Sequence, residues 1–235
     1  MLATGRSARH HRITARITAH HRIAVEHHPR FRTGGRAMAL TVADITTDHQ
    51  AYAESRPQLR RQMIPVRAER RVRVGDIVLA EFENEQTLRY QVQEMVYTER
   101  LTASADVAHE IEAYSRLLPG SHVLTATVFI ELNVLETVRQ ELSRLAGLQH
   151  SLSLEIGGTR IAGEEIPGLD EDPDVPSETV SVHMVRFALT DELRDAFRDP
   201  DVPAELVVDH PEYNDSTPLT GATRRALIAD LALRP

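Results

Sequence analysis

The chain contains no cysteine. This absence excludes disulfide bonds, thiolate catalysis, iron–sulfur clusters ligated by the chain itself and zinc sites built on cysteine. A protein of this sequence that serves such chemistry must therefore borrow it from a partner. Tryptophan and lysine are missing as well, so all 27 basic residues are arginines, which indicates a codon bias and not a design for one ligand.

Long apolar runs are also missing. No stretch reaches the roughly 18–20 residues that a membrane-spanning helix needs. The N-terminus lacks the apolar core of about 7–15 residues that is typical of a secretory signal. The sequence therefore predicts a cytoplasmic protein with no membrane partner. Glycine-rich phosphate loops, the Gly-x-Ser-x-Gly elbow and the His-Glu-x-x-His zinc helix are absent too, so no motif assigns an enzyme class.

Charge divides the chain into two parts. Residues 1–37 hold eight arginines, six histidines and one acidic residue, Glu26, whereas acidic side chains prevail in residues 38–235. An acidic body repels nucleic acid and anionic membranes and favours proteins or cations as partners. The basic segment is an arm for nucleic acid, a histidine metal site, or upstream sequence translated from a start before Met38. We favour the last interpretation, with a disordered tail as the next choice.

Apolar periodicity alternates between helical and strand patterns along residues 38–235. Helices are predicted at residues 48–61 (capped by Asp44 or Thr47 and interrupted at Pro57), 84–100, 106–118 and 134–145, after Thr190, and from Thr217-Pro218 onward. Strands are predicted at residues 77–82, 123–132, 152–156, 159–161, 179–189 and 204–209, with a basic solvated surface at 67–73 and a loop at 164–178. Gly157-Gly158 closes a hairpin, and the alternating strands favour antiparallel pairing. The predicted fold is one α+β domain, a mostly antiparallel sheet packed with several helices.

Three polar segments are candidates for chemistry. The first follows the strand at 77–82 and contains Glu83, Asn84, Tyr90, Gln91, Gln93 and Glu94. The second is His183 and Arg186 in a strand, and the third is Asp209, His210 and Tyr213 at the end of another strand. Because amides both donate and accept hydrogen bonds, the first segment predicts a hydrogen-bonded network.

Three interpretations of these segments stay open. In a structural one, which we favour, a buried Arg186 is paired by Glu83 or Glu94, because an unpaired buried charge is costly. In a second, the side chains are ligands of a divalent metal, for which the candidates are His183, His210, Glu94 and Asp209. In a third, Arg186 and the amides of residues 91–94 bind a small anion.

Several of these residues form a recognisable set. The pieces are Phe82-Glu83-Asn84 with Thr87 and Tyr90-Gln91-Val92-Gln93-Glu94-Met95, then His183 with Arg186-Phe187 and Leu189-Thr190, then Asp209-His210-Pro211 with Tyr213. With them the chain resembles a bacterial family catalogued as domain of unknown function 3501. The resemblance covers residues 38–231 and leaves out the basic segment. That family has no established activity, so the resemblance carries over no catalytic role.

The resemblance does imply a context. Genes of this family sit beside rubrerythrin-like proteins and iron–sulfur oxidoreductases, which implies an accessory role in peroxide defence or iron–sulfur electron transfer. The absence of cysteine fits a partner of such a system and not its redox centre. We therefore expect a non-catalytic protein that docks onto a redox partner. The alternatives are a metal-dependent enzyme or a small-anion-binding protein that uses His183, Arg186, His210 and the polar cluster of residues 83–94.

Overall fold

A computed structural model describes residues 40–132, 138–166 and 181–232 of the chain. The predictions for residues 1–37 lie outside these ranges. The helices are η1 (Val42–Asp44), α2 (His49–Ala68), α3 (Glu85–Thr98), α4 (Ser104–Ser115), α5 (Val138–Arg144), η2 (Leu148–Ser151), α6 (Asp191–Arg198) and α7 (Gly221–Ala232). The strands are β1 (Arg71–Val74), β2 (Val78–Phe82), β3 (Val123–Ile130), β4 (Leu152–Ile156), β5 (Thr159–Ala162), β6 (Glu164–Glu165), β7 (Val182–Ala188), β8 (Ala204–His210) and β9 (Tyr213–Pro218).

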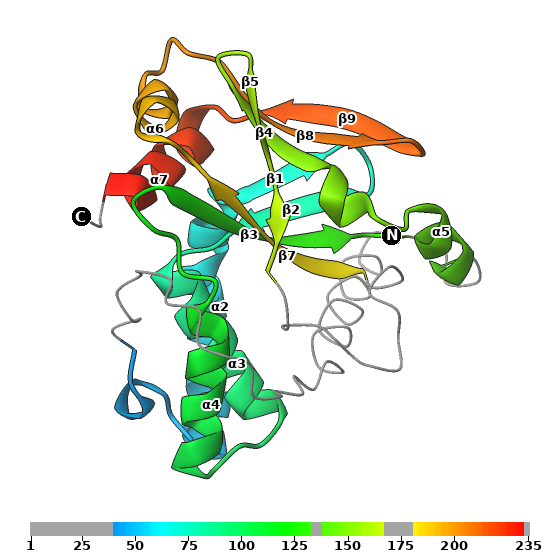
Figure 1. Ribbon diagram of the computed structural model, residues 1–235. Coiled ribbons are helices and arrows are strands. Elements are labelled where there is room, and N and C mark those ends of the chain that lie inside the picture. The colour runs from blue at the N-terminus through cyan, green and yellow to red at the C-terminus, as the bar shows by residue number, and fades with distance from the viewer. Residues whose placement is uncertain (1–39, 133–137, 167–180, 233–235) are drawn as a thin grey trace, which may run out of the picture.

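Two antiparallel sheets form the centre of the molecule. One sheet has the strand order β1-β2-β3-β7-β6, and the other has the order β5-β4-β8-β9. Helices α2, α3 and α4 extend from the first sheet, while α6 and α7 lie at one end of the two sheets (Figure 1). The predicted α+β class with antiparallel pairing is therefore confirmed, although the strands divide into two sheets.

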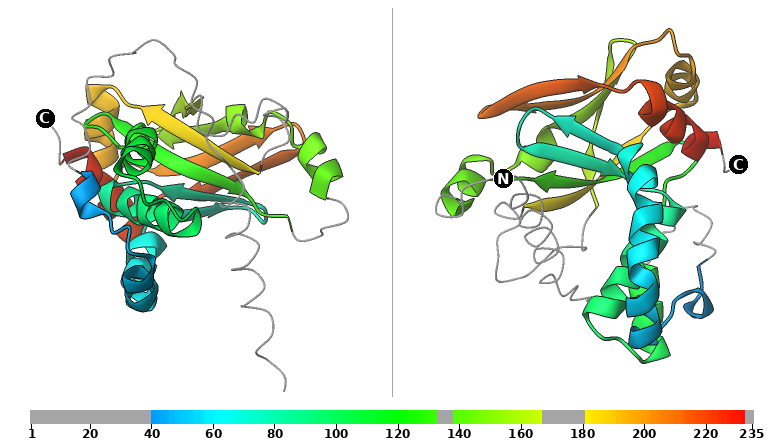
Figure 2. Two further views of the ribbon diagram at one scale, coloured as in Figure 1. Left: turned by 90° about the horizontal axis from the view of Figure 1, so that it is seen from below. Right: turned by 180° about the vertical axis from the view of Figure 1, so that it is seen from behind.

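The main core lies between the sheets. Strands of the first sheet contribute Phe82 and Phe187, whose ring centroids are 6.2 Å apart, and strands of the second contribute Leu154 and Leu206, which are fully buried. A second apolar cluster joins α3, α4 and the segment around η1. Figure 2 shows α2, α3 and α4 grouped at one side of the first sheet. The outer face of that sheet is covered in part, since Glu81 and Thr127 are buried whereas Arg71 and Arg73 are exposed.

The covered part of the outer face of the first sheet is polar although it is buried. The strand register places Thr127 of β3 between Glu81 of β2 and Met184 of β7. Glu81 and Thr127 are each at most 3% exposed. Side chains alternate along a strand, so the polar positions that sequence alternation assigns to one face all point toward the helices.

Helix α2 differs from its prediction. It runs unbroken through Pro57 and Pro65 to Ala68, and the side chain of Asp48 caps it by accepting hydrogen bonds from two backbone N–H groups. A proline removes a hydrogen bond from the carbonyl four residues earlier. Both prolines occupy exposed positions of the helix, where water can satisfy such carbonyls. The predicted interruption and the predicted caps are therefore wrong.

The basic stretch at 67–73 agrees with the predicted solvated surface in part, since Arg71 and Arg73 are exposed and paired with acids, whereas Arg70 is buried. Arg70 is 6% exposed and donates to both carboxylate oxygens of Asp230 in α7, at 2.5 and 3.0 Å. Arg67 and Arg71 both donate to the buried Glu81. These arginines fix the end of α2 to the sheet and to the last helix.

Two short strands replace predicted turns and loops. Glu164 and Glu165 form β6 and pair with β7, whereas most of the predicted loop lies outside the described residues. Residues Tyr213–Pro218 form β9, and α7 begins only at Gly221. In the described part of the chain, no helix combines the length and the apolar character needed to cross a bilayer.

Candidate functional site

The candidate site begins where β2 passes into α3. Phe82 points into the core, so its neighbours Glu81 and Glu83 point to the opposite face, toward the helices. Asn84 caps α3: its side chain accepts from the Thr87 backbone N–H, and the Thr87 hydroxyl accepts from the Asn84 backbone N–H, both at 2.9 Å. This capping box sets the direction in which α3 leaves the strand.

Glu83 is the most enclosed acid of this region, at 1% exposure. Its carboxylate accepts from the hydroxyls of Thr87 and Thr127, each at 2.5 Å, and from the side-chain amide of Gln91 at 2.8 Å. Burial raises the pKa of Glu83, and the neighbouring Glu81 raises it further, against the three hydrogen bonds. Glu83 is therefore the carboxyl of the site that is held closest to its neutral form.

Glu81 is the charged counterpart of Glu83. Arg67 donates to its two oxygens at 2.5 and 2.8 Å, and Arg71 adds a third bond at 2.9 Å. Two guanidinium groups thus share one buried carboxylate. Bidentate pairs of this kind are the strong ones among charge-assisted hydrogen bonds.

Glu94 joins α3 to α2. It accepts from the Tyr52 hydroxyl at 2.7 Å and from Arg56 at 2.9 and 2.6 Å. Burial alone would raise the pKa of Glu94, but the hydrogen bonds from Arg56 and Tyr52 outweigh burial and lower it. Arg56 also lies over the ring of Tyr97, 5.0 Å from its centroid.

These side chains form one continuous region between the sheet and the helices. We call it the acid–arginine layer, and it consists of Tyr52, Arg56, Arg67, Arg71, Glu81, Glu83, Tyr90, Gln91 and Glu94. Two of its three carboxylates are ion-paired, and the third is fully buried and hydrogen-bonded. Its chemistry is acid–base and electrostatic.

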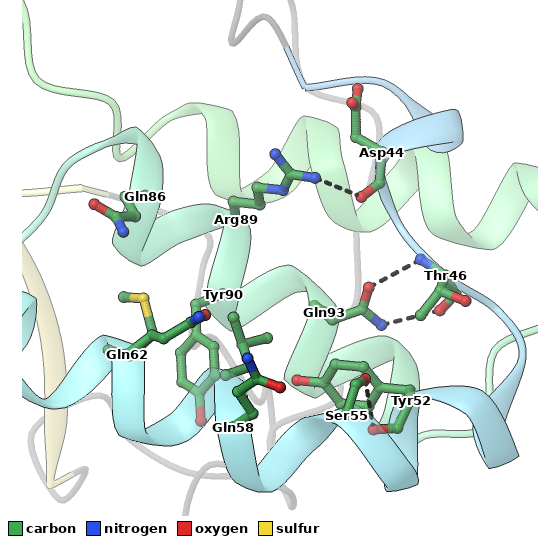
Figure 3. Close-up of a pocket in the computed structure, with 12 residues that line it drawn as sticks. Asp44, Thr46, Tyr52, Ser55, Gln58, Gln62, Gln86, Arg89, Tyr90 and Gln93 are labelled. Atoms are coloured by element: carbon green, nitrogen blue, oxygen red, sulfur yellow. Dashed lines mark hydrogen bonds between the residues drawn. The ribbon is translucent and has the colours of Figure 1, made fainter.

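A cleft of about 470 Å³ opens beside the contact between α2 and α3 (Figure 3). It is lined by Asp44, Thr46, Tyr52, Ser55, Gln58, Leu59, Gln62, Met63, Gln86, Arg89, Tyr90 and Gln93. Gln93 exchanges two hydrogen bonds of 2.9 Å with the backbone of Thr46, which fixes the wall formed by the segment around η1. The amides of Gln58, Gln62 and Gln86 make no hydrogen bond with a described residue.

The second predicted segment lies elsewhere. Arg186 pairs with Glu164 of β6 at 2.8 Å, and its side chain is 41% exposed. The predicted pairing of Arg186 with Glu83 or Glu94 is therefore wrong, because the short strand β6 places Glu164 directly opposite Arg186 in the register. His183 is buried and contacts Glu165 at 3.0 Å through Nδ1.

The third predicted segment lies on the second sheet. Asp209 accepts from Arg160 at 2.9 Å and from Asn214 at 2.7 Å. His210 contacts the carbonyl oxygen of Ala146 at 3.1 Å. The Tyr213 hydroxyl donates to the carbonyl oxygen of Val74 at 2.7 Å, which ties β9 to β1. These residues hold structural elements together.

The four candidate metal ligands are consequently dispersed. His183 lies on β7 of the first sheet, Asp209 and His210 lie on β8 of the second sheet, and Glu94 lies on α3. Across the ranges that the structure describes, no group of three or more His, Asp or Glu side chains is arranged to hold a metal ion. The first predicted segment alone is brought together, with Gln93 turned toward the cleft.

The sequence interpretation missed half of the acid–arginine layer. Tyr52, Arg56 and Arg67 belong to α2, and Arg71 and Glu81 belong to strands. Arginines at helical spacing along residues 56–67 are a signal in principle, but the predicted helix ended at residue 61. The strand partners depend on register, which the sequence does not state.

The fold and the site define an α+β protein with two antiparallel sheets and a partly buried acid–arginine layer between the first sheet and the helices. The chain belongs to the family of proteins of unknown function called DUF3501, whose model matches residues 39–231. A crystal structure of a protein of unknown function from Burkholderia pseudomallei K96243 is similar, with 27% sequence identity, a TM-score of 0.72, and coverage of 82% of this chain and 99% of that chain. A search of curated proteins found no match. The resemblance stated from the sequence is confirmed.

Proposed function

We propose that this protein is a non-catalytic, cytoplasmic accessory protein that docks onto a redox partner through the cleft between α2 and α3. The observation that carries the proposal is the cleft itself. Its floor is apolar, formed by Leu59, Met63 and Tyr90, and its rim holds amides that have no partner within the described residues. Such a surface offers both apolar contact and hydrogen bonds to a polypeptide partner.

The contacts of the predicted candidates His183, His210, Asp209 and Glu94 support a binding role. His183, His210 and Asp209 are each engaged by protein groups in separate places. Glu94 is held by Arg56 and Tyr52. None of these contacts pairs a nucleophile with a base, the arrangement that covalent catalysis needs.

The redox character of the partner rests on two further points. The chain has no cysteine with which to hold an iron–sulfur cluster. The family resemblance implies genes that sit beside rubrerythrin-like and iron–sulfur proteins. A partner would therefore supply the redox centre, and this chain would supply recognition.

Site-specific photo-crosslinking tests the proposal. A benzoylphenylalanine residue replaces Gln62 at the rim of the cleft, and in a matched control it replaces the exposed Ser216 on β9. Both variants are expressed in the native host, irradiated and purified, and their adducts are identified by mass spectrometry and metal analysis. We expect an iron protein crosslinked from position 62 and not from position 216. Recovery of no iron protein, or of the same adducts from both positions, would contradict the proposal.

A further inference from the structure

Three arginines follow one side of α2. Successive residues turn by about 100° around a helix, so Arg56, Arg60 and Arg67 fall within about 40° of one another. Arg56 is paired with Glu94, and Arg67 is paired with Glu81. Arg60 is exposed, and it makes no hydrogen bond or ion pair with any residue that the structure describes. One guanidinium of the row is therefore free to bind a ligand.

Tyr90 of α3 lies beside this row. Its ring is half-buried at the contact of α2 with α3 (Figure 3), and its hydroxyl has no hydrogen-bond partner within the described ranges. Burial raises the pKa of Tyr90 and the nearby Glu94 raises it further, while Arg60, Arg67 and Arg56 act in the opposite direction. Arg60 lies one turn after Arg56 on α2, and Tyr90 lies one turn before Glu94 on α3, so the pairing of Arg56 with Glu94 brings Arg60 and Tyr90 to neighbouring positions. The hydroxyl of Tyr90 can donate its proton to a hydrogen bond.

The local charge balance is positive, in contrast to the net charge of −8 for the chain. The region holds four arginines and three carboxyl groups. The arginines are Arg56, Arg60, Arg67 and Arg71, and the carboxyl groups are those of Glu81, Glu83 and Glu94. Of these, Glu83 is fully buried, and it accepts three hydrogen bonds from neutral groups and none from an arginine. An anion is therefore the ligand that this side of α2 attracts.

We propose that Arg60 and the hydroxyl of Tyr90 bind a small oxyanion, a carboxylate or a phosphate. A guanidinium group matches the oxygen spacing of both anions and forms two parallel hydrogen bonds to them. Tyr90 donates a further bond, and the paired Arg56 and Arg67 add a positive potential. The anion site predicted from the sequence used Arg186, but Arg186 is paired with Glu164. In the proposed site Arg60 is the arginine that binds the anion. The site needs no docking partner, so it stands or fails separately from the proposed function.

Isothermal titration calorimetry of the full chain tests this site. The titrants are sodium phosphate and, separately, sodium succinate, with sodium chloride holding the ionic strength constant, since salt screens exposed charges. We expect saturable binding to one site. Arg60→Gln should weaken it by about tenfold or more, because a charge-assisted hydrogen bond is lost. Tyr90→Phe should weaken it by a smaller factor.

Arg61→Gln is the matched control. Arg61 is the next residue of α2, is exposed, and lies about 100° further around the helix. The same charge is removed, and the arginines of residues 1–37 remain in both variants, so the comparison isolates the site. Binding of either anion identifies the ligand class. Absence of saturable binding of both anions, or an equal loss in Arg61→Gln and Arg60→Gln, overturns the proposal. Equal melting temperatures of the variants show that the fold is intact.

Discussion

Glu83 has the least ordinary surroundings of any side chain in the acid–arginine layer. It accepts hydrogen bonds from two threonine hydroxyls and one amide, and no cation among the described residues bonds to it. Burial therefore decides its ionisation and raises its pKa. Glu94, only partly buried, is held by Arg56, and its pKa is lowered. The pKa values of these two carboxyls, one just before α3 and one within it, are therefore shifted in opposite directions.

This contrast predicts a pH-dependent stability difference. A raised pKa means that folded Glu83 keeps its proton where the unfolded chain has released it, so its contribution to stability is lost as pH rises through the folded pKa. The wild type should therefore lose stability relative to Glu83→Gln as pH rises above about 5, past the ordinary pKa range of a glutamate. Urea unfolding followed by circular dichroism measures the difference at each pH.

Glu94→Gln is the control for that measurement. The pKa of Glu94 is lowered, so Glu94 titrates below the pH range of this measurement. Its contribution to the stability of the protein is lost only as pH falls through its folded pKa. The difference in the free energy of unfolding between the wild type and Glu94→Gln should therefore stay constant over the same pH range. A flat difference for Glu83→Gln would show that the buried acid is ionised throughout.

Residue types predicted part of this network. Gln91 and Glu83 stand in the segment whose amides indicate hydrogen bonding, and they do bond each other. Thr127 lies 44 residues away in the chain, and only the pairing of β2 with β3 brings it to Glu83. The sequence shows which residues carry polar groups, whereas strand register determines which of these groups bond to each other.

At the scale of elements, the sequence predicted most segments with strong apolar patterns and missed short or polar ones, among them β1, whose alternation of arginine and valine was interpreted as a basic surface. Strand β9 consists of polar and exposed residues, so no alternation identified it. Strand β6 has two residues, and pairing with β7 alone defines it. Helix α2 continues because its prolines lie on exposed turns, a feature that depends on packing and not on propensity.

Gly163 links two of these elements across the molecule. The chain passes there from β5 of one sheet to β6 of the other. A Cβ atom at this position would lie 2.6 Å from a methyl carbon of Val185 and 3.0 Å from the ring of Phe187. Both neighbours are fully buried. The absence of a side chain at Gly163 is therefore a condition for the crossing.

Gly163→Ala should destabilise the protein by about 1–3 kcal/mol, the range found when a packed core receives an extra methyl group. Gly120→Ala is the matched control, because its new Cβ would meet nothing closer than Val123 at 3.8 Å. Thermal and urea unfolding of both variants give the comparison. Equal stabilities of the two variants would mean that the crossing relaxes to accept a side chain.

At the scale of the whole molecule, contacts between distant segments hold the layers together. Tyr213 of β9 binds the backbone of β1, and Thr217 donates to the carbonyl oxygen of Arg73. These bonds join the edges of the two sheets. The sequence offered no signal for them, since each depends on elements that meet only in the folded chain.

The longest of these links is the pair formed by Arg70 and Asp230. The two residues lie 160 positions apart, and both nitrogen–oxygen contacts are buried. Removal of one partner leaves the other charge buried without this ion pair, which costs about 3–5 kcal/mol. Arg70→Met and Asp230→Leu should each lower the free energy of unfolding by about that amount.

The double variant measures the interaction between Arg70 and Asp230 apart from the contacts that each makes with its surroundings. When both charges are replaced by apolar side chains, the desolvation cost disappears, and such replacements are often neutral or stabilising. We therefore expect the combined Arg70→Met and Asp230→Leu variant to be more stable than either single variant, as measured by urea unfolding in a double-mutant cycle. Additive losses would show that the two side chains act independently. In that case α7 would be held to the sheet by its apolar contacts, through Leu227 and Leu231, and not by the buried ion pair.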